Sequence, residues 1–286
     1  DIPTYLVSGI FRQRQGFFQW YGGMLRPVLS NFRHLFVQDE ESRRLLETIG
    51  YGDRTSICGD TRFDRVIAIQ QLAKQFPWAA AFSGRENGKT PDSPFTLVAG
   101  SSWPKDEDIL LAHFNQHPEM KLILAPHEIH EEHVQSIIGK LQRPYLRYSE
   151  LKKKWESGEV PADTLPADQP VDCLIIDAIG FLSGIYRYGD VAYIGGGFGV
   201  GIHNTLEAAV YGMPVIFGPN HQAFREALGL IDAKGGYPIA SSEDYVQTIT
   251  RFMTDAEVLK VAGENAGRYV QEGSGATEMI FKAVFK

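Results

Sequence analysis

One glycine-rich segment carries the strongest signal for chemistry in this 286-residue chain. An apolar run, Ala192–Ile194, is followed by five glycines between positions 195 and 201, then by His203, Asn204 and Glu207. Glycines let the backbone approach a ligand closely, and the N–H groups at the start of a helix favour a phosphate. The segment therefore predicts a phosphate-binding loop at the carboxyl end of a strand, where open parallel sheets bind ligands.

Two other interpretations of this segment compete with the phosphate site. A tight glycine turn with Asn204 as N-cap and Glu207 completing a capping box explains those two residues but not five glycines. A dinucleotide site is disfavoured because, in G-x-G-x-x-G starting from Gly197, position 202 is isoleucine. The next strand ends in Gly218–Pro219, with no acidic residue for a ribose.

A second group of polar residues follows an apolar run that ends at Pro126. His127 is the first residue after this strand, so we expect it to meet a ligand there. His130 and His133 are three apart, whereas H-E-x-x-H needs a spacing of four to place both histidines on one helix face. We therefore predict no metal site, and expect His130 and His133 to be solvated helix residues.

Covalent catalysis has no support in the sequence. There is no G-x-S-x-G elbow, and the two cysteines, Cys58 and Cys173, lie in apolar runs that indicate neither a disulfide framework nor a zinc site. Gly84–Thr90 resembles a P-loop, but it has one residue too few between its glycines and is predicted to be an exposed loop.

The elements that must position these residues alternate between apolar runs and stretches of helical spacing. This pattern predicts an α/β class with a parallel sheet and crossover helices. Lys152–Pro170 is expected to be a solvated loop, and a helix should begin near Asp39. The predicted strands are Tyr5–Val7, His34–Val37, one ending at Cys58, Phe95–Ala99, Lys121–Ala125, Cys173–Ile176, Val191–Ile194 and Pro214–Phe217.

Composition limits the partners. A net charge of −7 and a pI near 5.6 argue against a nucleic-acid binder, and no apolar run approaches the ~20 residues that cross a bilayer. Residues 11–26 interleave aromatic side chains with arginines, as a surface for anionic lipid or a phosphorylated partner would. The alternative, a buried helix face with solvated arginines, is the favoured interpretation on sequence alone.

Seven ordered motifs extend across nearly all of the chain: Gly59–Asp64, Gly100–Ser102, Pro126–His127, Asp177–Leu182, Gly195–Gly197, His203–Ala209 and Gly218–Pro219. Each is weak alone, but in this order and spacing they resemble the bacterial 3-deoxy-D-manno-octulosonic acid (Kdo) transferases of lipopolysaccharide biosynthesis.

The resemblance implies a GT-B-type glycosyltransferase with two Rossmann-like domains. Residues 1–70 would be the C-terminal portion of the acceptor-binding domain, and residues 71–286 the nucleotide-sugar donor domain. The last helix is expected either to stay with the donor domain or to pack back on the first domain. Because family members are longer at the N-terminus, the general base and the membrane anchor are expected outside this sequence.

The implied reaction is an inverting transfer of Kdo from CMP-Kdo to a lipid A precursor, without metal or cofactor and without nucleic acid. It would take place at the cytoplasmic face of the bacterial inner membrane, with the fragment itself soluble, donor-binding and inactive. Two alternatives remain open. One is a GT-B transferase or epimerase that uses a UDP-sugar, and the other is a non-catalytic nucleotide-sugar-binding module.

The resemblance also assigns roles to individual residues. Arg62 would stabilise the transition state. Three positions depart from the family pattern: His127 stands where arginine is common, Phe181 where glutamate is common, and Arg62 where lysine is common. The implied donor-binding residues are Gly100, Ser101, Ser102, Pro126, His127, Ile179, Gly180, Phe181, Gly196, Gly197, His203, Asn204, Thr205, Leu206, Glu207, Gly218 and Pro219.

Overall fold

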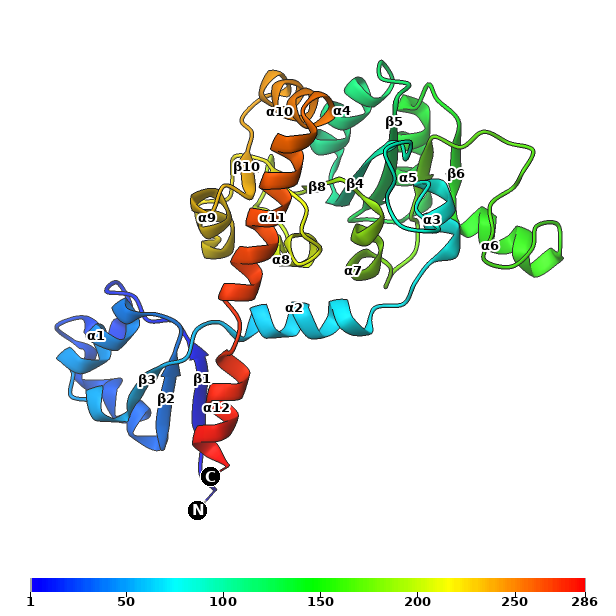
Figure 1. The fold of residues 1–286 in the computed structure, drawn as a ribbon. Coiled ribbons are helices and arrows are strands. Elements are labelled where there is room, and N and C mark those ends of the chain that lie inside the picture. The colour runs from blue at the N-terminus through cyan, green and yellow to red at the C-terminus, as the bar shows by residue number, and fades with distance from the viewer. Residues whose placement is uncertain (1, 286) are drawn as a thin grey trace. The chain divides into compact units, whose positions relative to one another are not determined.

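The computed structural model describes residues 2–285 and divides them into two compact units (Figure 1). The first unit runs up to Ala68 and takes in the chain again from Gln271 onward. The second unit is Ile69–Val270. Helix α2 (Thr61–Leu72) contains the boundary between the units.

The first unit is built on a three-stranded parallel sheet of order β1-β2-β3. Helix α1 begins where predicted, because the Asp39 carboxylate accepts a hydrogen bond from the backbone N–H of Ser42 at 2.7 Å. The elements of this unit are β1 (Tyr5–Gly9), the 3-10 helices η1 (Gly16–Phe18), η2 (Gly22–Met24) and η3 (Arg26–Asn31), β2 (His34–Val37), α1 (Glu40–Thr48), η4 (Gly52–Arg54), β3 (Thr55–Ile57) and α12 (Ala276–Val284).

The aromatic and basic segment between β1 and β2 is divided between core and surface. Phe11 and Leu29 are buried in one cluster with Leu35 and Leu46. Phe17 and Phe18 pack, partly buried, against the same cluster. The favoured interpretation, a buried helix face, is wrong for the remaining apolar side chains, because Trp20, Tyr21, Met24, Leu25 and Val28 are exposed. Three short 3-10 helices cannot bury one continuous stripe as a regular α-helix would.

The Gly59–Asp64 motif joins α2 to the C-terminal segment of the same unit. The Asp64 carboxylate accepts hydrogen bonds from the backbone N–H groups of Gly275 and Thr277, at 2.7 and 2.8 Å, where α12 begins. Helix α12 packs through Ala276 against Phe36 and Cys58. The motif thus has a structural role in this unit.

The second unit is built on a seven-stranded sheet of order β10-β9-β8-β4-β5-β7-β6, with every neighbouring pair parallel. Its strands are β4 (Phe95–Ser102), β5 (Met120–Pro126), β6 (Tyr145–Arg147), β7 (Cys173–Ile175), β8 (Val191–Ile194), β9 (Val215–Phe217) and β10 (Gly236–Pro238). Its helices are α3 (Pro77–Phe82), α4 (Pro104–Phe114), α5 (Glu131–Lys140), α6 (Tyr148–Ser157), α7 (Leu182–Ile185), η5 (Tyr186–Tyr188), α8 (Leu206–Ala209), α9 (Arg225–Asp232), α10 (Ser242–Thr254) and α11 (Ala256–Glu272).

One large hydrophobic cluster of the second unit lies on one face of this sheet. Alternate residues of the strands, such as Leu97, Leu122 and Tyr193, pack against α4, α5, α10 and α11. The central strands are buried on both faces, as parallel sheets require, and this explains their continuous apolar sequences.

The predicted parallel α/β class is confirmed, and each predicted strand overlaps an observed one. Two short strands were missed, β6 and β10, which lie at the edges of the sheet. The predicted loop Lys152–Pro170 is wrong over its first six residues, because α6 continues to Ser157. Across residues 2–285, no helix is long and apolar enough to span a membrane.

Candidate nucleotide-binding site

The second sheet has a switch point between β4 and β8. From β4 the chain builds β5, β6 and β7 on one side, then returns to place β8 on the other side. Ligands of open parallel sheets bind beyond the carboxyl ends of the strands at such a point. Four predicted groups follow these ends: Gly100–Ser102 on β4, Pro126–His127 on β5, Gly195–Gly197 after β8 and Gly218–Pro219 after β9.

Backbone hydrogen bonds join these strand ends directly. The N–H of Gly195 donates to the carbonyl of Gly100 at 2.9 Å, and the N–H of His127 donates to the carbonyl of Ser102 at 2.9 Å. The structure therefore brings together residues of three motifs that are far apart in the sequence.

The glycine-rich loop needs its glycines for close backbone contact. A Cβ on Gly195 would overlap the carbonyl oxygen of Ser101, and one on Gly197 would lie 2.6 Å from the Cα of Gly218. Gly196 has a φ of +92°, a conformation that side chains disfavour. The loop thus packs tightly on the neighbouring strand ends.

Asp106, which the sequence analysis missed, fixes this loop. Its fully buried carboxylate accepts hydrogen bonds from the backbone N–H of Trp103 at 2.9 Å, the backbone N–H of Gly196 at 2.8 Å and the hydroxyl of Tyr193 at 2.7 Å. Burial, together with the charge and hydrogen bond of Asp106, raises the pKa of Tyr193, so that it stays a donor.

Three rings stack over the strand ends. The imidazole of His127 lies between the indole of Trp103 and the imidazole of His203, with centroids 4.6 and 4.5 Å away. The indole N–H of Trp103 donates to Nε2 of His203 at 3.2 Å. Burial, and then the neighbouring His127, lower the pKa of His203, which leaves this imidazole neutral near pH 7.

The competing interpretation, a capping box at Asn204 and Glu207, is wrong in detail. Helix α8 begins after Thr205, and Oδ1 of Asn204 accepts from the N–H of Leu206 at 3.1 Å. The Glu207 carboxylate accepts from the side-chain amide of Asn204 at 3.0 Å instead of from a backbone N–H. Thr205 is fully buried, and its hydroxyl has no hydrogen-bond partner. Such an orphaned group requires an explanation.

The predicted donor-binding residues Ile179 and Phe181 lie in surroundings unlike those of the glycine-rich loop. Ile179 is 88% exposed, and the Phe181 ring packs against Phe76 and Tyr148 at centroid distances of 5.2 and 4.4 Å. The helical segment that follows does reach the strand ends, because a Cβ on Gly100 would overlap the hydroxyl of Tyr186.

Arg62, the predicted catalytic residue, lies in the first unit. Its Nε and Nη2 bind Oδ2 of Asp60 at 2.9 and 2.7 Å, and its backbone N–H donates to Oδ1 at 2.9 Å. Asp60 is buried, and its carboxylate holds the guanidinium group of Arg62 in one orientation. The Arg62 side chain is itself about half exposed.

A cavity of about 320 Å³ opens beside the glycine-rich loop. Gly196 and Phe198 line it from one side, and Trp103, Lys105 and Asp106 line it from the start of α4. Gly196 is the one predicted donor-binding residue among those that line this cavity.

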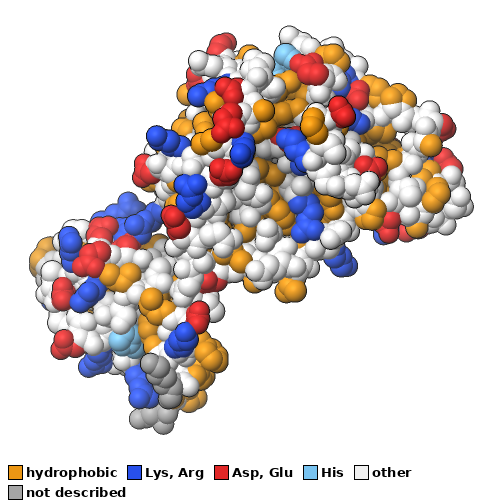
Figure 2. Space-filling view, in the orientation of Figure 1, with side chains coloured by type: hydrophobic (Ala, Val, Ile, Leu, Met, Phe, Trp, Pro, Cys, Tyr) orange, Lys and Arg blue, Asp and Glu red, His pale blue; other side chains and the backbone are white. Residues whose placement is uncertain are grey.

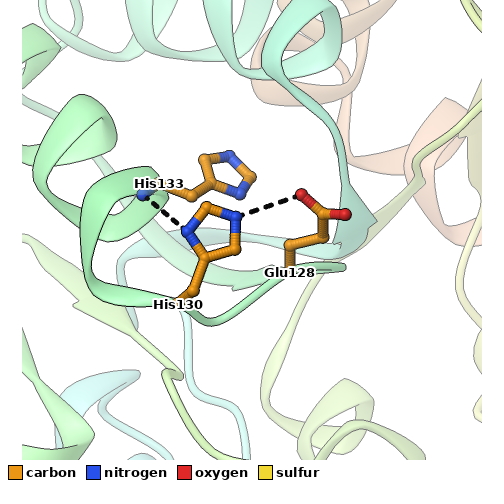
Figure 3. Close-up of side chains that lie close together, drawn as sticks. All are labelled: Glu128, His130 and His133. Atoms are coloured by element: carbon orange, nitrogen blue, oxygen red, sulfur yellow. Dashed lines mark hydrogen bonds and ion pairs between the residues drawn. The ribbon is translucent and has the colours of Figure 1, made fainter.

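His130 and His133 occupy different surroundings. His130 is exposed, as expected, but the expectation that His133 is solvated is wrong. The first turn of α5 turns that ring inward, where it is 6% exposed and binds the buried Glu107 at 2.9 Å. Both imidazoles lie close to Glu128 (Figure 3).

The missed residues had only weak local signals. Asp106 stands two residues after Pro104, where an acidic residue is typical of a helix start. Its bonds to Gly196 and Tyr193 span 90 and 87 positions of sequence, which no local pattern reports.

Comparison with known proteins supplies the context. Residues 1–65 match the family model described as 3-deoxy-D-manno-octulosonic-acid transferase (kdotransferase). The 3-deoxy-D-manno-octulosonic acid transferase of Rickettsia prowazekii is 26% identical over 254 residues, which is 85% of this chain and 50% of that protein. The chain spans about half the length of these curated relatives.

Two solved structures share the fold. The C-terminal CMP-Kdo binding domain of WaaA from Acinetobacter baumannii has a TM-score of 0.53 at 18% identity, over 73% of this chain and 99% of that one. UDP-GlcNAc 2-epimerase from Neisseria meningitidis, bound to UDP-GlcNAc, has a TM-score of 0.60 at 14% identity, over 98% and 70%. The chain is thus similar to the 3-deoxy-D-manno-octulosonic acid transferases, and it has the Rossmann-like parallel-sheet fold expected of GT-B glycosyltransferases.

Proposed function

We propose that this chain forms the donor side of a glycosyltransferase that moves Kdo from CMP-Kdo to a lipid A precursor with inversion. The observation that carries the proposal is the meeting of the ends of β4, β5, β8 and β9 at one switch point. The relatives named as Kdo transferases and the shared fold of a CMP-Kdo binding domain support the choice of donor.

The donor phosphate would lie at the start of α8, next to the glycine-rich loop. His127 and His203 would supply ring nitrogens there. The Glu207 carboxylate, held by Asn204, would accept hydrogen bonds from ribose hydroxyls.

Groups fixed in advance would stabilise the departing nucleotide. Asp106 holds Gly196 in place before a ligand arrives, so the loop needs no rearrangement when charge develops on the leaving phosphate. We propose that Arg62, oriented by Asp60, stabilises the same transition state. Attack by the acceptor hydroxyl also needs a general base, and no residue of this chain is assigned that role.

We propose that the first unit contributes to the acceptor side. Five apolar side chains between η1 and β2 are exposed, and they are here named the Trp20 patch: Trp20, Tyr21, Met24, Leu25 and Val28. Arg14 and Arg26 belong to the same segment. Apolar and aromatic side chains with flanking arginines suit a lipid interface with anionic headgroups. We propose that this surface meets the inner membrane at its cytoplasmic face.

A UDP-sugar enzyme is the second candidate, because the UDP-GlcNAc 2-epimerase covers nearly the whole chain at the higher TM-score. A shared fold does not select the base or the sugar. Isothermal titration of the chain with CMP and, separately, with UDP distinguishes the two. We expect saturable CMP binding and UDP binding at least tenfold weaker. Tighter binding of UDP would favour the second candidate.

A further inference from the structure

The loop between β5 and α5 carries a cluster that the proposed transfer does not use. Glu128 and His130 come from the loop, and His133 from the first turn of α5. One ligand atom from each of the three side chains lies within 4.8 Å of the other two. Figure 3 shows the three side chains converging on a common region.

His133 is prepared to donate a lone pair into this region. Its Nε2 bonds to the carboxylate of the buried Glu107 at 2.9 Å, so the ring proton is on Nε2 and the lone pair on Nδ1. Nδ1 is buried and has no hydrogen-bond partner, and Figure 3 shows this side of the ring toward His130. Glu107 is itself fixed by the hydroxyl of Ser102 at 3.0 Å.

This arrangement is the one that metal-binding histidines adopt. A ligating imidazole commonly gives its other N–H to a carboxylate, which fixes the tautomer and the ring orientation. The hydrogen bond to Glu107 leaves Nδ1 of His133 as a buried acceptor without a partner. Such an atom lowers the stability of the folded protein. A bound cation would satisfy Nδ1 of His133.

Glu128 and His130 supply the other two ligands. Oε2 of Glu128 and Nε2 of His130 are 3.2 Å apart, close to the ~3.3 Å between neighbouring ligands of a tetrahedral ion with bonds of about 2.0–2.1 Å. Both side chains are about half exposed, so they can adjust toward His133 and leave one position for water.

Metal binding would change one existing contact. Nδ1 of His130 accepts from the backbone N–H of His133 at 3.2 Å and caps α5. When Nε2 of His130 binds a metal, the ring proton must move to Nδ1, and this capping bond breaks. Losing an N-cap costs about 1 kcal/mol, which is small beside the binding free energy of a three-ligand site.

We propose that Glu128, His130 and His133 bind a divalent transition-metal ion of the Zn²⁺ class. Two imidazoles and one carboxylate suit Zn²⁺, whereas Mg²⁺ and Ca²⁺ take oxygen ligands. The site is separate from the proposed nucleotide contacts, although Glu107 and Ser102 connect the two.

The test is isothermal titration of the metal-free 286-residue chain with ZnCl₂, with MgCl₂ as comparison. We expect one Zn²⁺ per chain and no saturable Mg²⁺ binding. Zn²⁺ should also raise the midpoint of thermal unfolding. The variants are Glu128→Gln and His130→Asn, since asparagine keeps an N-cap acceptor but removes the imidazole. Each should weaken Zn²⁺ binding about tenfold or more.

His117→Asn is the matched control. His117 pairs with Glu119 at 2.8 Å, so it offers a similar histidine–glutamate pair away from the cluster, and Zn²⁺ affinity should not change. Two results would overturn the proposal: absence of saturable Zn²⁺ binding, or binding that His130→Asn and Glu128→Gln leave unaltered. Thermal unfolding of the metal-free variants verifies that they fold.

Discussion

At the scale of the residue, Asp106 holds the proposed donor loop together. It is fully buried and satisfies two backbone N–H groups and the hydroxyl of Tyr193. Asp106→Ala leaves these buried donors without partners, so we expect a loss of about 3–5 kcal/mol in the free energy of unfolding. Asp106→Asn keeps an acceptor and should lose less. Urea denaturation measures both, and equal stability of wild type and Asp106→Ala would contradict the assigned role.

His113 predicts a pH dependence of stability. Burial, and then the adjacent His117, lower the pKa of His113 to about 4. The unfolded chain takes up this proton near pH 6.5, so the stabilising contribution is complete above that pH and is lost as the pH falls toward 4. From His113 alone we expect a loss of about 2 kcal/mol between pH 7 and pH 5.

His113→Leu should remove this part of the acid sensitivity. Denaturant unfolding of wild type and variant at several pH values between 4 and 7 gives the comparison. If both proteins lose stability equally over that interval, the buried neutral imidazole is not the cause.

At the scale of the element, the Asp64 carboxylate fixes the start of α12. Burial opposes the charge on Asp64, but the N–H groups of Gly275 and Thr277 outweigh it and lower the pKa. Asp64→Ala should destabilise the start of this helix by about 1–2 kcal/mol. Hydrogen exchange of the α12 amides should become several-fold faster, while Asp64→Asn has a smaller effect. Unchanged protection in Asp64→Ala would show that packing alone holds α12.

Helices and strands could be predicted where the local sequence pattern determines them. The central strands are buried on both faces, so β4, β5 and β8 appear as apolar runs. The edge strand β6 has three residues, of which Tyr145 is exposed, and its pairing with β7 is fixed by tertiary contacts. Residues 152–157 of α6 were assigned to a loop because their lysines and glutamate are also typical of loops.

The residues of the candidate sites were likewise predictable only where local sequence determines their position. The glycine loop and His127 could be placed at strand ends because a strand's end is visible in the sequence. The inward turn of His133 and the bonds of Asp106 could not be predicted, since their partners, Glu107 and Gly196, are 26 and 90 positions away.

At the scale of the whole molecule, the charge distribution argues against a nucleic-acid partner, and the exposed apolar side chains indicate a partner of another kind. Acidic and basic side chains are interspersed over the face shown in Figure 2, unlike the concentrated positive surface of a nucleic-acid binder. The Trp20 patch is different, with Trp20 93% and Met24 91% exposed. The rings of Trp20 and Tyr21 contact each other, with centroids 5.6 Å apart, and exposed apolar side chains of this size suit an interaction surface.

Membrane binding through this patch is directly measurable. The double variant Trp20→Ala, Met24→Ala should float several-fold less with vesicles containing phosphatidylglycerol than wild type does. Leu72→Ala is the control, because Leu72 is 85% exposed but lies outside the patch. Equal flotation of the double variant and wild type would remove the patch from the proposed interface.

The donor site itself is tested by the affinity of the chain for CMP before and after removal of the Glu207 carboxylate. A hydrogen bond from a ribose hydroxyl to a charged acceptor contributes about 1.5–3 kcal/mol, so Glu207→Ala should bind CMP at least about tenfold more weakly. Glu243→Ala, which removes a glutamate from the start of α10, should bind as wild type does. We expect isothermal titration calorimetry to show weaker CMP binding for Glu207→Ala and unchanged binding for Glu243→Ala. CMP binding of equal strength in wild type and Glu207→Ala would contradict the proposed nucleotide site.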